Sequence, residues 1–248
     1  MTAELTCYMF SSQRSDTRAD GLIEMQAQRV IQQIVRPKSV SEVVLDQLRA
    51  DIVTNKFELG QKISEAQLSE LYNVTKAPIR AAYIRLEAEG LIEIRAQAGT
   101  FVFNLSAEEL QALAELRAAL ELQAISLAMA RNLASLQREV SSNYDEMVKC
   151  AESDDADGYQ KLDTNLHMLF VQHANSPFLA ETYASKVSGR FAALRTRFSQ
   201  QKRHIEHSLA EHKELRDAIA AGDVDTATRL LSAHIGYSQV YYRGFAKG

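Results

Sequence analysis

Residues 63–102 constrain the fold of this chain most, because two helix patterns and a hairpin pattern follow one another with almost no linker. Ser64 precedes the first helix pattern, and Gln67 three residues later completes a capping box. A second pattern begins near Lys76, with Pro78 in the first turn, where a missing N–H costs nothing. The sequence therefore predicts two short helices joined by a tight turn.

Apolar side chains divide each of these helices into two sides. Leu68 and Leu71 are expected to face inward from the first helix, and Ile79, Tyr83 and Leu86 recur at three- and four-residue spacing in the second. The side chains left on the opposite side of the second helix, or at its start, are those of Thr75, Lys76, Ala77 and Arg80. The Thr75 hydroxyl is also expected to cap this helix.

A hairpin follows the second helix directly. Gly90 is expected to end that helix, and residues 91–95 and 100–103 alternate like two short strands around the turn at 96–99. Helix, turn, helix and ribbon are the plan of a winged helix-turn-helix, which places one helix in the major groove of DNA. Gly99 would let the ribbon, the wing, turn tightly against the duplex.

Charge alone does not predict DNA binding, because the chain has a net charge of −4. The signs are nevertheless sorted along residues 36–104, where acidic side chains gather at the far end of the second helix and the root of the wing. The basic residues expected at the DNA face are Arg36, Lys38, Lys76, Arg80 and Arg95. Such a face is enough to contact several phosphates.

Composition sets the outer limits of the prediction. The 248 residues suffice for two modest domains, and 46% hydrophobic content with few Pro and Gly fits a mostly helical protein. We expect a cytoplasmic protein with no membrane segment, because no apolar run approaches the roughly 18 residues of a membrane helix and the start lacks a signal-peptide pattern. Cys7 and Cys150 lie far apart, which argues against a disulfide framework.

Residues 1–35 form an extension of their own. A polar start is followed by residues 22–35, whose apolar side chains have mixed helical spacing. Two interpretations stay open: a short helix packed on the body or on a partner subunit, and plain disorder.

From Ser106 onward strand patterns disappear. The expected helices cover residues 106–132, 135–152, 155–174, 177–200, 205–221 and 224–245. Their breaks carry turn residues such as Asn-Ser-Pro at 175–177. The predicted fold class is therefore mainly α, an N-terminal winged helix-turn-helix (36–104) followed by an all-α antiparallel bundle (105–248).

Four polar residues of this bundle are candidates for a metal site. Asp163 and His167 are four apart and point the same way from one helix, while His212 and His234 lie on the last two helices, which can pack against it. Three imidazoles and a carboxylate suit Zn²⁺ or another first-row divalent ion. By spacing alone, ordinary surface or hydrogen-bonded histidines remain the alternative.

The first domain resembles the DNA-binding domain of the GntR family of bacterial transcription regulators. Upstream apolar residues and Gly60 resemble the family's leading helix and its turn, although Asn55 and Leu59 stand where glycine and proline are common. In the second helix this chain has TKAPIRAAY at 75–83, where family members usually show SRTPVREAL. Lys76 therefore replaces an arginine that often reads guanine, so operator preference cannot be copied from relatives.

The second domain resembles the FCD effector domain of the FadR-like subfamily, in its shorter, VanR-type branch. That resemblance rests on an Asp-x-x-x-His at 163–167, Glu211-His212 opening an AIAAGD helix, and a last histidine, His234. It implies that Asp163, His167, His212 and His234 bind a divalent ion, Zn²⁺ foremost, with Ni²⁺ or Mn²⁺ as alternatives. His173, His204 and His207 have no counterpart in the pattern.

The same resemblance implies a small carboxylate effector beside the metal. Arg117 matches an arginine that faces the family's pocket, and Arg190 and Arg195 are further candidates for an anionic ligand. Arg117 could instead pair with Glu121 on a solvated helix face.

The predicted function is a homodimeric, ligand-responsive regulator, a repressor that leaves an inverted-repeat DNA operator when the carboxylate binds. The alternative is a metal-dependent helical-bundle enzyme acting on a small organic acid. That alternative is disfavoured because the chain has no HExxH, no paired Glu-x-x-His and no nucleophile or phosphate-binding motif.

Overall fold

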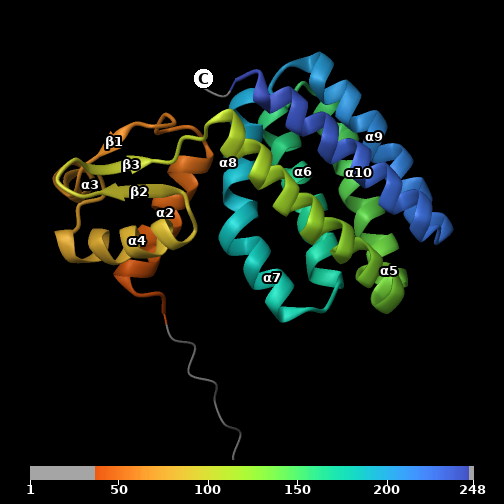
Figure 1. The fold of residues 1–248 in the computed structure, drawn as a ribbon, viewed down its shortest axis with the longest axis horizontal. Coiled ribbons are helices and arrows are strands. Elements are labelled where there is room, and N and C mark those ends of the chain that lie inside the picture. Colours follow the sequence, from red (N-terminus) through yellow and green to blue (C-terminus); the bar gives the residue numbers. More distant parts are fainter. Residues whose placement is uncertain (1–36, 246–248) are drawn as a thin grey trace, which may run out of the picture. The chain divides into compact units, whose positions relative to one another are not determined.

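The computed structural model describes residues 37–245 (Figure 1). The expected helix within residues 22–35, Cys7 and the predicted DNA contact Arg36 lie outside the described residues. Within the described part, buried apolar side chains form two clusters: one is centred on the N-terminal winged domain and also includes Ala193, and the other lies among the later helices. The predicted class, a winged helix-turn-helix followed by a helical bundle, is confirmed.

Helices α2 (Val40–Val53), α3 (Glu65–Leu71) and α4 (Lys76–Ala88) build the winged domain. The predicted capping box at Ser64 and Gln67 is present and sets the start of α3. Ile79 and Leu86 of α4 are fully buried, as their spacing predicted. The prediction for Leu71 is wrong, because α3 ends at that residue and leaves half of its surface exposed.

Three short antiparallel strands complete this domain: β1 (Lys62–Ile63), β2 (Ile92–Arg95) and β3 (Gly99–Val102), in the order β1-β3-β2. The hairpin of β2 and β3 agrees with the prediction within one residue at each end, and Ile94 pairs with Thr100. The sequence did not reveal β1. Two residues are too few to show an alternating pattern, and they are extended because they pair with β3.

The helical domain follows from Ser106, whose side chain caps its first helix. Its elements are α5 (Ala107–Glu152), α6 (Ala156–His173), α7 (Pro177–Tyr183), η1 (Ala184–Ser188), α8 (Gly189–Phe198), α9 (Lys202–Ala221) and α10 (Val224–Arg243). Helix α5 packs against α6, α9 and α10 (Figure 1).

Two predicted helix boundaries in this domain need correction. The expected break at 132–135 is a kink within α5, where Asn132 has φ −141° and its side-chain amide donates to the His173 carbonyl at 2.7 Å. Residues 177–200 form not one helix but α7, the π-helical turn η1 and α8. The segments on either side of the kink and of the π turn each keep helical apolar spacing, so spacing within a segment does not show whether two neighbouring segments form one helix or two.

Candidate metal centre and nucleic-acid interface

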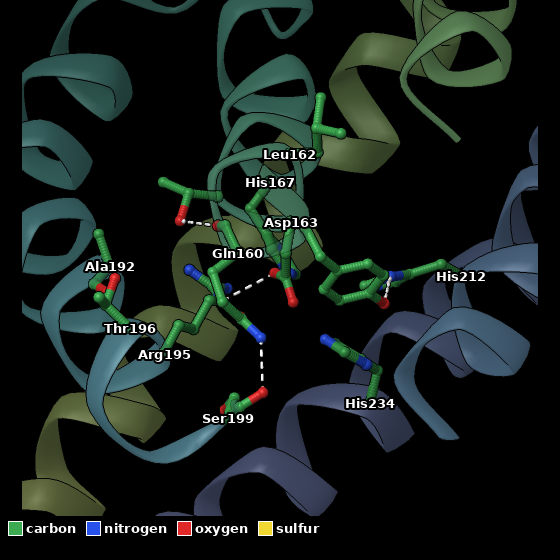
Figure 2. Close-up of polar contacts among 12 residues, drawn as sticks. Gln160, Leu162, Asp163, His167, Ala192, Arg195, Thr196, Ser199, His212 and His234 are labelled. Atoms are coloured by element: carbon green, nitrogen blue, oxygen red, sulfur yellow. Dashed lines mark hydrogen bonds and ion pairs between the residues drawn. The ribbon is translucent and has the colours of Figure 1, made fainter. Parts of the chain in front are cut away.

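Three predicted metal ligands come together inside the helical domain. His167 of α6, His212 of α9 and His234 of α10 each offer a ring nitrogen, and these nitrogens all lie within 4.8 Å of one another. All three side chains are buried. Figure 2 shows His212 and His234 turned toward the helix that carries Asp163 and His167.

Carboxylates behind two of the imidazoles determine which nitrogen can bind a metal. Glu121 Oε2 lies 2.6 Å from His167 Nδ1, and Glu211 Oε2 lies 2.8 Å from His234 Nδ1. Since a carboxylate only accepts, each Nδ1 carries a proton, and in the neutral ring the lone pair is then on Nε2. An imidazole that donates from Nδ1 to a carboxylate and can bind metal through Nε2 is common around protein-bound zinc.

The third imidazole has a free nitrogen of its own. His212 Nδ1 lies 3.4 Å from the Tyr159 hydroxyl, and the buried Nε2 has no hydrogen-bond partner among the described residues. Burial, reinforced by neighbouring positive charge, holds the pKa values of His212 and His234 well below the ordinary histidine value. Both rings are therefore neutral at pH 7, the form that binds metal, and the donor set fits a borderline divalent ion.

Asp163 lies beside this histidine trio, but its carboxylate is already paired. Oδ1 is 2.7 Å from Arg195 Nε and 3.4 Å from His167 Nε2. Burial alone would raise the pKa of Asp163, but the positive charge of Arg195 holds that pKa well below its usual range. The residue is thus ionised and adjacent to the three histidines, although its oxygens are not part of the group within 4.8 Å.

Arg117 is completely buried, so the solvated surface pair with Glu121 that the sequence left open does not exist. Its Nε donates to Glu121 Oε1 at 2.8 Å, its Nη2 donates to His167 Nε2 at 2.9 Å, and its guanidinium lies 4.5 Å from the centre of the Phe191 ring. Nη1 is buried without a hydrogen-bond partner within residues 37–245. A polar atom in this state can bind an anion that enters the site.

The other two predicted arginines differ in position. Arg195 faces the metal candidates through Asp163, and its Nη2 is likewise buried without a partner in the described chain. Arg190 does not face this site: its Nε donates to the Gly90 carbonyl of the winged domain at 2.9 Å. The two residues are five apart on α8, which places their side chains roughly 140° apart around the helix axis.

The residues that support the candidate metal ligands were not predicted in that role. Glu121 was considered only as a partner of Arg117, yet it also accepts from His167 and, at 2.7 Å, from the Tyr183 hydroxyl. Glu211 was noted beside His212 in the family pattern, but its carboxylate contacts His234 and, through Oε1 at 3.3 Å, His207. These pairs are separated by up to 62 residues in sequence, so no local spacing could reveal them.

The predicted DNA-reading residues share one exposed side of the winged domain. Thr75, Lys76, Ala77 and Arg80 are all exposed at the start of α4. The predicted cap is wrong in one respect: Thr75 is the N-cap residue by backbone position, but its hydroxyl makes no capping hydrogen bond. Arg80 is paired with Glu65 of α3, at 2.8 Å.

Two further predicted contacts also lie in exposed ion pairs. Lys38 Nζ is 2.6 Å from Asp46, and Arg95 Nη2 is 2.8 Å from Glu93. Exposed pairs of this kind contribute little to stability, so both cations are free to exchange a carboxylate for a phosphate. Gly99, in the wing turn, has φ +117°, a conformation that other residues rarely adopt.

A winged helix-turn-helix joined to a helical domain with buried histidine and arginine side chains defines a DNA-binding protein with a separate ligand-binding domain. Comparison with known protein families leads to the same class of protein. Residues 40–102 match the family described as bacterial regulatory proteins, gntR family, and residues 112–237 match the FCD domain. The chain belongs to the GntR family of transcription regulators with an FCD domain, and it is not an enzyme.

Relatives cover most of the chain. The HTH-type transcriptional repressor RspR of Escherichia coli K12 is 28% identical over 201 residues, 79% of this chain and 86% of RspR. The Nta operon transcriptional regulator of Aminobacter aminovorans is 30% identical over 185 residues, 74% of this chain and 85% of its own.

Solved structures share the fold. A GntR regulator from Rhodococcus sp. RHA1 has a TM-score of 0.72 at 22% identity, covering 85% of this chain and 100% of its own. E. coli McbR/YncC has a TM-score of 0.73 at 16% identity, covering 84% and 100%. Within the described residues, every helix is too short or too polar to cross a membrane.

Proposed function

We propose that the protein is a repressor that leaves its operator when a small carboxylate binds beside a metal ion in the helical domain. Residues 36–104 read the DNA and residues 105–248 bind the effector and the partner subunit of a homodimer. RspR is named a repressor, which favours repression over activation. DNA-bound regulators of bacteria act in the cytoplasm.

The metal would be held by the Nε2 atoms of His167, His212 and His234, with Asp163 as the fourth ligand. Nitrogen donors of this number favour Zn²⁺, with Ni²⁺ or Mn²⁺ as alternatives. When bound, the ion supplies a Lewis-acid anchor for an anionic oxygen. To bind the ion, His167 Nε2 must release its hydrogen bond from Arg117, which leaves that guanidinium available to the effector.

A carboxylate effector is supported by one observation above all. Arg117 Nη1 and Arg195 Nη2 are both buried without a hydrogen-bond partner in the described residues, and both guanidinium groups contact residues of the metal site. Leaving a charged donor buried and unsatisfied is costly. A carboxylate oxygen would satisfy such a donor and take part in a charge-assisted hydrogen bond.

Helix α8 offers a physical route from effector to DNA. Arg195 of this helix pairs with Asp163, while Arg197 donates through Nη2 to the carbonyls of Ile52 and Phe57 in the winged domain, at 2.7 and 2.6 Å. Burial lowers the pKa of Arg197 to about 10, which still leaves it charged at pH 7. An effector that recruits Arg195 would therefore shift a helix that also contacts the DNA-binding half.

DNA reading is assigned to the exposed start of α4. Thr75, Lys76, Ala77 and Arg80 would face base edges, and Gly99 and Arg95 would bring the wing to the backbone or minor groove. Lys38 and Arg36 would contact phosphates. Two such domains on a two-fold axis would read an inverted repeat.

Metal analysis combined with a thermal-shift screen of small carboxylic acids tests this proposal. We expect about one divalent ion per chain, a rise in Tm with one class of acid, and loss of binding to a selected operator when that acid is added. The acid should have no effect on DNA binding after chelation. Protein that contains no metal after purification without chelator, and that shows no shift with Zn²⁺, Ni²⁺ or Mn²⁺, would remove the metal from the proposal.

A further inference from the structure

Arg80, the exposed arginine near the start of α4, is held in an ion pair by the carboxylate of Glu65 in the neighbouring helix α3. Arg80 Nε donates to both Oε1 and Oε2 of Glu65, at 2.8 Å each. Glu65 is the first residue of α3, whose start is set by the capping box of Ser64 and Gln67. The backbone that carries this carboxylate is therefore well fixed.

The ion pair with Glu65 leaves Nη1 and Nη2 of the Arg80 guanidinium available for a DNA contact. Arginine has five N–H donors, and this contact uses only the one on Nε. In the part of the chain that the structure describes, Nη1 and Nη2 of Arg80 make no hydrogen bond, and the Arg80 side chain is 65% exposed. The Nη edge is the donor fork that matches O6 and N7 of guanine in the major groove.

We infer that Glu65 is a positioning residue for DNA reading, which holds the Arg80 guanidinium so that its Nη fork is presented to a base edge. The inference rests on the proposed reading role of Arg80. An arginine held at Nε has lost part of its rotamer freedom before DNA arrives, so the base contact orders less. Specific binding gains from this, whereas non-specific binding, which needs no fixed orientation, does not.

The negative charge of Glu65 also favours specific over non-specific DNA binding. Arg80, by its hydrogen bond, and Lys76 hold the pKa of the Glu65 carboxyl below its usual value, so the group is ionised at pH 7. A fixed negative charge among the predicted DNA contacts opposes indiscriminate binding to phosphates. Glu65 is thus expected to increase the ratio of specific to non-specific affinity rather than affinity as such.

A merely structural role for this pair would predict something different. Helices α3 and α4 are already joined through the buried side chains of Leu68 and Ile79, and the Ser69 hydroxyl donates to the Val74 carbonyl in the turn. An exposed ion pair adds little to such packing. Loss of the Glu65 charge should therefore change DNA discrimination with little change in thermal stability.

The test uses Glu65→Gln in the full-length protein, with Glu70→Gln as a matched control. Glu70 is exposed on the same helix α3 and has no ion pair within residues 37–245, so its variant changes the net charge equally. Affinity is measured at one salt concentration for an operator selected from random duplexes and for an unrelated duplex. We expect Glu65→Gln to lower the specific to non-specific ratio about fivefold or more, and Glu70→Gln to leave it within about twofold.

Arg80→Ala and the double variant Glu65→Gln/Arg80→Ala complete a cycle. If Glu65 acts through Arg80, its substitution has no further effect on the ratio once Arg80 is alanine. The inference is overturned if Glu65→Gln leaves the ratio unchanged, if its effect persists in the Arg80→Ala background, or if both affinities fall together with Tm. An unchanged ratio for Arg80→Ala itself would instead refute the reading role of Arg80, and the inference with it.

Discussion

Replacement of Arg117 by methionine isolates the energetic role of the buried charge network. Methionine keeps much of the length and apolar contact of the side chain but removes the charge. The variant loses the 2.8 Å pair with Glu121, the hydrogen bond to His167 and the contact with the Phe191 ring. Glu121 is left fully buried, with His167 and the Tyr183 hydroxyl as its remaining donors.

The magnitude follows from the state in which Glu121 is left. Burial would raise its pKa, and Arg117 and His167 together hold that pKa well below its usual range. Breaking a buried ion pair by removing one partner costs about 3–5 kcal/mol, because the other charge stays desolvated. In Arg117→Met/Glu121→Gln no isolated charge remains, so we expect the double variant to recover at least about 1 kcal/mol of that loss.

Urea denaturation of chelated protein measures both variants against the parent, with the slope m as a check that the transition itself is unchanged. The reasoning is refuted if Arg117→Met costs less than about 1 kcal/mol at constant m, or if the double variant loses the sum of the two single losses.

Three further outcomes are expected. The double variant His212→Ala/His234→Ala should lose most bound metal, and chelator should no longer lower its Tm. In the parent, an ion at a hundred times its Kd adds about 2.7 kcal/mol to the free energy of unfolding. Parent protein with clearly less than one metal ion per chain would contradict this prediction. Chelated protein should lose stability as the pH falls from 7.5 to 5.5. Burial lowers the folded-state pKa values of His212, His234 and His204. Below the ordinary histidine pKa near 6.5, these side chains therefore take up protons only in the unfolded chain, which stabilises the unfolded state. The raised pKa of Glu211 opposes this effect but is outnumbered, and a Tm that stays flat or rises on acidification would argue against neutral buried imidazoles. Gly90→Ala should lower the free energy of unfolding by about 1–2 kcal/mol, because Gly90 has φ +68° and an added Cβ would meet Arg190 Nη2 at 1.4 Å. Adding Arg190→Ala should relieve the clash but not the backbone strain. An unchanged Tm for Gly90→Ala would refute both the clash and the strain.

Much of the winged domain could be predicted from sequence because its determinants are local. The Ser64 capping box, Pro78 in the first turn of α4 and Gly90 beyond its end act within a few residues, and backbone hydrogen bonding converts them directly into helix ends. The side of α4 that is exposed follows from three- and four-residue spacing for the same reason. The pairing of β1 with β3 is not local, and it was missed.

The metal candidates were identified by resemblance and by the one-turn spacing of Asp163 and His167, but their surroundings were decided by tertiary packing. Which side of α8 faces the site separates Arg195 from Arg190, and no spacing along the chain specifies that side. The contact of Glu121 with His167 joins residues 46 apart. A sequence pattern determines where a side chain leaves its own helix, whereas its partner depends on how the helices pack, because burial, charge and hydrogen bonding must be satisfied together in one core.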